Sequence, residues 1–167
     1  MIQLPVRSIN PHFVPSVWLT IVPGFRHVRH DPFDATSRFE NRPLFDFELH
    51  TKRGRWQPSL RTRFEGRFIE NQSGFLRIRV RPGVRYSLST RWNRPPALIV
   101  TNEFFFDFRA DRYNRNKFQV GISLPATAQF SLMPYYMLLS NRPLASWHHD
   151  SIWGLSLFWS FQKASPP

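Results

Sequence analysis

The stretch LRIRVRPGVRYSLS, residues 76–89, places an arginine at every second position through its first half. Arg77, Arg79, Arg81 and Arg85 alternate with aliphatic or aromatic residues. Successive side chains of a β-strand point to opposite faces, so the alternation predicts a strand with one apolar and one cationic face. The fold must therefore offer this strand an apolar environment on one side and counter-charges on the other.

The same period of two recurs along the chain, in segments separated by turn-like stretches such as TKRG, NQSG and NRPP. The predicted strands span residues 16–29, 38–50, 55–69, 76–89, 97–109, 115–125, 128–140 and 150–161. They are longer than the five or six residues usual in soluble sheets. We predict a single β domain at 16–161, preceded by an irregular segment at 1–15 and followed by a tail at 162–167.

The composition narrows the classes of partner. The chain of 167 residues has 23 Lys and Arg against 11 Asp and Glu, a formal net charge of +12, and 16% of its residues are aromatic. Such a balance favours an anionic partner: nucleic acid, a phospholipid headgroup or lipopolysaccharide. The chain has no cysteine, which excludes disulfides and thiolate metal sites. It also has no run of 18 apolar residues, so the sequence predicts no transmembrane helix.

Two architectures accommodate strands with one apolar and one charged face. In a soluble β-sandwich the apolar faces meet each other, and in a transmembrane barrel they meet lipid. The barrel is favoured by the mixed signs of the charged face, by aromatic residues near strand ends and by strand length. The prolines within predicted strands argue against it, because each removes a ladder hydrogen bond. They are Pro43, Pro58, Pro82 and Pro134.

The predicted fold class is all-β: an antiparallel up-and-down β-barrel of about eight strands. The alternative is a wider barrel whose N-terminal strands this chain lacks. A barrel of this size has an interior just filled by side chains. We predict that arginines of this interior meet acidic residues of neighbouring strands, especially Glu65 and Glu103. The predicted lumen charge network is Arg61, Arg63, Glu65, Arg67, Arg77, Arg79, Arg81, Arg85, Glu103 and Asp107. The predicted lipid-facing aromatics are Phe64, Phe68, Phe104, Phe106, Trp153, Trp159 and Phe161.

The stretches NEFFFDF, residues 102–108, and DRYNRNKFQVGISL, residues 111–124, resemble a family of Gram-negative outer-membrane β-barrel proteins catalogued only as a domain of unknown function. The resemblance rests on an Asn-Glu-aromatic-Phe stretch, then an Asn-Arg pair opening a strand with glycine at its centre. It implies a barrel, a bacterial outer-membrane location, no established activity, and outer-membrane lipid or lipopolysaccharide and the barrel-assembly machinery as partners. The start MIQLPVRSIN lacks the features of a signal peptide, so we expect a truncated or misannotated start.

One stretch hints at catalysis, HHDS at residues 148–151. His149 and Ser151 are two residues apart and would share a strand face, as in deacylases that trim lipid A from outside a barrel. Such an enzyme needs a histidine that takes the serine proton and a carboxylate that orients the histidine. No such acid is identifiable, and Ile152 follows the serine where asparagine is expected. A polar loop before the last strand is the simpler interpretation, and we predict no enzyme, cofactor or metal site.

Three hypotheses for function follow. The first is an outer-membrane barrel with a structural role or passage of small solutes, anions in particular. The second is a membrane-embedded lipid A hydrolase using His149 and Ser151. The third is a soluble basic β-protein that binds nucleic acid. The third is disfavoured, because aromatic side chains that stack on bases would have to share a face with the arginines, and here they occupy the opposite face.

Overall fold

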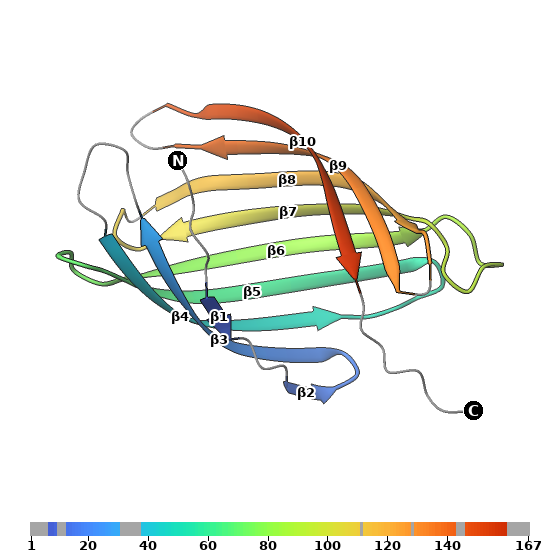
Figure 1. Cartoon of the computed structure of the whole chain (residues 1–167), viewed down its shortest axis with the longest axis horizontal. Helices are drawn as coiled ribbons and strands as arrows, with labels where there is room; N and C mark the ends of the chain where they lie inside the picture. The colour runs from blue at the N-terminus through green and yellow to red at the C-terminus, as the bar shows by residue number, and fades with distance from the viewer. Residues whose placement is uncertain are drawn as a thin grey trace.

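The computed structural model describes residues 7–9, 13–30, 38–110, 112–127, 129–142 and 146–159. Within these ranges the protein is a single antiparallel sheet of ten strands (Figure 1). The strands are β1 (Arg7–Ile9), β2 (Phe13–Ser16), β3 (Leu19–His30), β4 (Arg38–His50), β5 (Trp56–Ile69), β6 (Phe75–Ser87), β7 (Ala97–Asp107), β8 (Arg112–Pro125), β9 (Phe130–Asn141) and β10 (His148–Trp159). None of the described residues form a helix long and apolar enough to cross a membrane.

The connectivity is up-and-down. From β3 to β10 each strand pairs with the next one in the chain, and the two short N-terminal strands both pair with β3. The predicted strands correspond one for one to β3–β10, so the all-β, antiparallel, up-and-down prediction is confirmed. The segment 1–15, predicted to be irregular, contains β1 and most of β2.

The sheet is strongly curved, and β9 and β10 arch across one side of the view (Figure 1). Among the described residues, no ladder joins β10 to β1, β2 or β3. The predicted closure of the sheet into a barrel is therefore not seen in these ranges.

Burial alternates along the strands as a period of two requires. In β4, Glu40, Leu44 and Asp46 are buried, whereas Phe45 and Phe47 between and beside them are exposed. We call the face that carries these buried residues the inner face and the opposite one the outer face. The register aligns the strands so that acidic and basic side chains share the inner face.

The in-strand prolines coincide with gaps in the ladders. The β4–β5 ladder is interrupted at Pro43, the β6–β7 ladder at Pro82 and the β8–β9 ladder at Pro134, while the ladder to the other neighbour continues in each case. One side alone is affected because a strand residue directs its N–H to a single neighbour. Pro58 lies just outside the β4–β5 ladder, which begins with the pair of Ser59 and His50, so it removes no hydrogen bond from that ladder. The sheet therefore accommodates all four prolines.

Candidate functional site: the charged inner face

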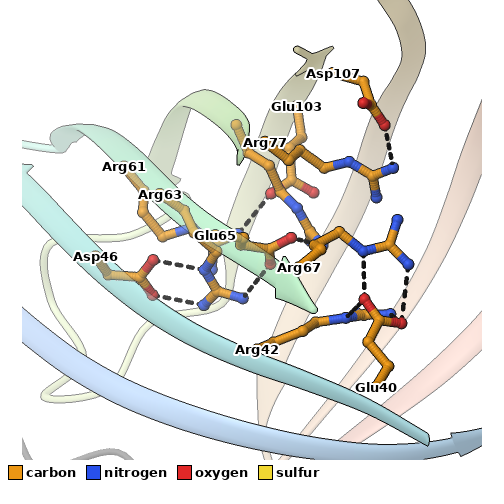
Figure 2. A network of polar contacts seen from close by, with 11 residues as sticks. Glu40, Arg42, Asp46, Arg61, Arg63, Glu65, Arg67, Arg77, Glu103 and Asp107 are labelled. Carbon is orange, nitrogen blue, oxygen red and sulfur yellow. Dashed lines mark hydrogen bonds and ion pairs between the residues drawn. The ribbon is translucent and has the colours of Figure 1, made fainter. Parts of the chain in front are cut away.

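A network of ion pairs covers the inner face of β4–β7 (Figure 2). Its anions are five buried carboxylates, of which Glu40 and Glu65 have no exposed surface at all. A buried carboxylate is costly unless it is paired and hydrogen-bonded. The basic partners come from the alternating arginines of β4, β5 and β6. The buried acids are Glu40, Asp46, Glu65, Glu103 and Asp107.

Glu40 is held by two arginines. Arg42 donates from Nε and Nη2 to its two carboxylate oxygens at 2.7 Å each. Arg67 donates to the same two oxygens at 2.5 and 2.9 Å. Arg42 reaches the carboxylate because residues two apart on a strand share a face, and Arg67 reaches it from the adjacent strand β5. Both arginines therefore make two-pronged contacts, the strongest geometry for this kind of pair.

Asp46 and Glu65 form the centre of the network. Arg63 donates to both oxygens of Asp46 at 2.5 Å and lies 3.7 Å from Glu65. Arg79 donates to the other oxygen of Glu65 at 2.8 Å. Arg63 and Arg79 are paired across β5 and β6, and Glu65 lies within reach of both guanidinium groups, which offsets their mutual repulsion.

Two further pairs extend the network to β7. Arg77 donates to Asp107 at 2.7 Å, between neighbouring strands. Arg61 of β5 donates to Glu103 of β7 at 2.6 Å, although β6 lies between these strands. The long side chain of Arg61 spans the two strand spacings, and the curvature of the sheet seen in Figure 1 is consistent with this contact. Glu65 and Glu103 both lie against arginines, but the partner of Glu103 is Arg61, two strands away, rather than an arginine of the neighbouring β6.

Arg81 and Arg85 differ from the expected pattern. We expected both to meet acidic neighbours, but neither has an ion-pair or hydrogen-bond partner among the described residues. In the register, Arg81 lies opposite Arg61, another arginine, and Arg85 lies opposite Gln57. The acidic side chains are concentrated towards the other end of the sheet, so the arginine series of β6 continues beyond its counter-charges.

Phe105 is a member of the inner face that the sequence pattern did not single out. It is only 1% exposed, and the charged groups of Arg79, Lys117 and Arg115 lie 4.7, 5.6 and 5.8 Å from its ring centroid. A ring face attracts cations through its quadrupole. The available signal was parity: residue 105 lies between Glu103 and Asp107 on the charged face. Three consecutive phenylalanines at 104–106 obscured that signal.

The aromatic residues predicted to face lipid lie on the outer face. Phe68 is 56% exposed and Trp153 is 81% exposed, the latter on β10. Phe64, Phe104 and Trp159 are also exposed, and Phe106 is partly exposed. Phe161, the remaining member of that set, lies outside the described residues.

The structure does not bring the two candidate catalytic residues into contact. His149 and Ser151 share the outer face of β10, but Nδ1 of His149 is hydrogen-bonded to Ser140 Oγ at 2.8 Å and Ser151 Oγ to the Tyr136 hydroxyl at 3.1 Å. The adjacent carboxylate, Asp150, points to the opposite face because neighbouring strand residues alternate. No group of three or more metal-ligating side chains occurs in the described ranges.

Comparison with known proteins gives one match. Neither the curated proteins nor the solved structures contain a significant match to this chain. The family profile described as a protein of unknown function, DUF2490, matches residues 8–149. This range includes the strands that carry the charged inner face and most of the described sheet. The chain therefore belongs to the DUF2490 family of proteins of unknown function.

Proposed function

We propose that this protein is a bacterial outer-membrane β-barrel with a structural role or a role in the passage of small solutes, anions in particular. One observation carries the proposal: the strands bury an ionised face and expose an apolar, aromatic one. In water the outer face would be a large exposed apolar surface, which soluble monomers rarely carry. In lipid the same face is favourable, and the ion pairs are shielded on the inner side.

The unpaired edge of the sheet supports closure. A membrane-spanning strand must satisfy every backbone N–H and C=O within the protein, because hydrocarbon offers no partners. The meander already satisfies the strands between β3 and β10. Pairing of β10 with the N-terminal edge would satisfy the rest, and the curvature of the sheet favours that pairing.

The inner face also constrains passage. The arginine–carboxylate pairs and Phe105 occupy the inner side of β4–β7, so a closed barrel of this chain would have no wide pore. Towards one end Arg85 has no carboxylate partner among the described residues, which favours anions over cations among small solutes. The proposal contains no catalytic step.

The test is a charge placed on the outer face. Phe64→Arg puts a guanidinium near the middle of β5, where lipid would surround it. In a membrane barrel we expect a loss of about 2–4 kcal/mol of unfolding free energy in lipid vesicles. On a water-exposed face the same change would cost less than about 0.5 kcal/mol. Ser59→Arg, on the inner face near the strand end, is the matched control, and we expect it to change little.

The location of the protein is measured in a second experiment. The chain is expressed behind a signal peptide, membranes are fractionated, and the outer-membrane fraction is run on a gel with and without boiling. We expect a detergent-dependent band whose mobility changes on heating. A product that is soluble without detergent, together with a neutral Phe64→Arg, would overturn the proposal.

A further inference from the structure

A cavity of about 560 Å³ lies at the end of the sheet where β6 leads into β7. This end of the sheet is on the right in Figure 1. We call this the Trp92 end; the described residues of its three connectors are 51–55, 88–96, and 126, 127 and 129. The volume is in the range of small-molecule sites in proteins. The cavity exists because small residues occupy the inner face here: Ser87, Ala97 and Ser123 are aligned across β6, β7 and β8. Nearer the middle of the sheet, arginines and Phe105 occupy the corresponding space.

The charges around this cavity are of one sign. Lys52, Arg55, Arg85 and Arg94 line it, and no carboxylate does in the part of the chain that the structure describes. Of the four, Arg55 alone has a polar partner among those residues, a 3.4 Å hydrogen bond from its guanidinium to the Tyr86 hydroxyl. An anion entering this cavity would meet cations that no internal acid neutralises.

The Trp92 end differs from the middle of the inner face in how its basic residues are neutralised. In the middle of the inner face, carboxylates hold Arg61, Arg63, Arg77 and Arg79 at 2.5–2.8 Å. At the Trp92 end the three connectors contain five basic residues and no acidic one: Lys52, Arg53, Arg55, Arg91 and Arg94. Because no carboxylate of the described residues lines this cavity, ions from solution or a ligand are the available counter-charge.

The uncharged residues that line the cavity indicate a ligand larger than a simple inorganic anion. Trp92 and Phe158 contribute aromatic rings, both more than half exposed. Hydroxyl and amide side chains, including Ser89, Thr90 and Asn93, supply hydrogen-bonding groups beside them. Rings that pack on an apolar face, together with hydroxyls and amides that bond to ligand hydroxyls, suit a sugar, whereas arginines suit a phosphate.

We propose that this cavity is a binding site for a phosphorylated sugar. Arg85 and Arg94 bind the phosphate, and Trp92 covers the sugar ring. The phosphorylated sugar is either a soluble metabolite or the headgroup of a glycolipid, since both present a sugar ring with an attached phosphate. The site requires the sheet and its connectors alone, so it does not depend on the proposed membrane location.

The test is binding to the purified full chain in detergent, measured by calorimetry and by Trp fluorescence. The probes are glucose 6-phosphate, glucose and inorganic phosphate. We expect glucose 6-phosphate to bind more tightly than either fragment, with an affinity that falls as salt is added. Arg85→Gln and Arg94→Gln should each weaken glucose 6-phosphate about tenfold or more, because each removes a charge-assisted contact.

The matched control is Arg91→Gln. Arg91 lies on the same connector as Arg94 and carries the same charge, but it does not line the cavity. It should leave binding within about twofold of the wild type, since only distant, screened charge is lost. The urea unfolding midpoint of each variant is compared with that of the wild type, so that a folding defect is not mistaken for a binding defect.

Lipid A in mixed micelles, a phosphorylated glycolipid, distinguishes the two sources. Competition with glucose 6-phosphate that is lost in Arg85→Gln would support the site with a lipid headgroup as its ligand. Binding of glucose 6-phosphate without such competition would support it with a soluble ligand. Glucose bound as tightly as glucose 6-phosphate, or equal losses in Arg91→Gln and Arg94→Gln, would overturn the proposal. So would a failure of all probes to bind.

Discussion

Glu40 is the residue at which the charged inner face is most open to test. Its carboxylate is completely buried, and four of the hydrogen bonds that it accepts come from two arginines, two from Arg42 and two from Arg67. Glu40→Gln preserves the size of the side chain but removes the negative charge and one acceptor oxygen. Two guanidinium groups then share a single carbonyl oxygen and face an amide N–H.

The size of the effect follows from these contacts. A hydrogen bond to a charged group contributes about 1.5–3 kcal/mol, and about two of the four are lost, which gives about 3–6 kcal/mol. Breaking a buried ion pair by removing one partner costs about 3–5 kcal/mol. The side chains of Arg42 and Arg67 are 14% and 13% exposed, so some water can reach them. We therefore expect a loss near the lower value, about 3 kcal/mol.

The assay is urea unfolding of the refolded protein in detergent, followed by Trp fluorescence. Glu70→Gln is the control, because Glu70 is exposed and accepts one hydrogen bond, from the Phe39 amide at 3.3 Å. It should cost less than about 0.5 kcal/mol. Replacing the three charged residues together, by Glu40→Leu, Arg42→Met and Arg67→Met, should recover much of the loss, since no buried charge is left alone. Equal unfolding free energies for Glu40→Gln and Glu70→Gln would refute the reasoning.

Two further changes probe the packing of the inner face. Phe105→Leu removes the ring that Arg79 and Lys117 approach and should destabilise the protein by about 1–3 kcal/mol in the same urea assay; an unchanged midpoint would mean that the ring contacts contribute nothing. Gly121→Ala places a Cβ about 3.0–3.2 Å from atoms of Pro134 and Met133 and from Tyr135 Cβ, including a backbone oxygen that cannot move freely. It should cost about 1–3 kcal/mol, whereas free accommodation would show that β8 and β9 can separate locally.

The strands and their faces could be predicted from the sequence because a period of two is a local property. Along β6 the alternation of Arg77, Arg79 and Arg81 with aliphatic residues assigns each side chain to a face without knowledge of any neighbour. The exposed aromatics of the outer face followed from the same parity. The short strands β1 and β2 were missed, because three or four residues are too few to show a period.

The partners within the candidate site were harder to predict, because they depend on register and curvature. Arg79 was placed on the charged face from the sequence, but its pairing with Glu65 rather than with an acid of β7 depends on how β5 and β6 are aligned. The contact of Arg61 with Glu103 depends on the register of three strands, because β6 lies between β5 and β7. A pattern within one strand contains information neither on its register with the neighbouring strands nor on the curvature of the sheet.

By itself the sequence determined that the chain forms a sheet of long antiparallel strands with one ionic and one apolar face. It also determined that basic residues outnumber acidic ones, because the net charge follows from the composition alone. The tertiary structure decided which arginines are neutralised and which are not. Arg63 and Arg85 stand at equivalent places in the alternation, yet Arg63 meets Asp46 while Arg85 borders an open cavity. The physical reason is that an ion pair requires two side chains within about 4 Å, and that proximity arises from residues far apart in the chain.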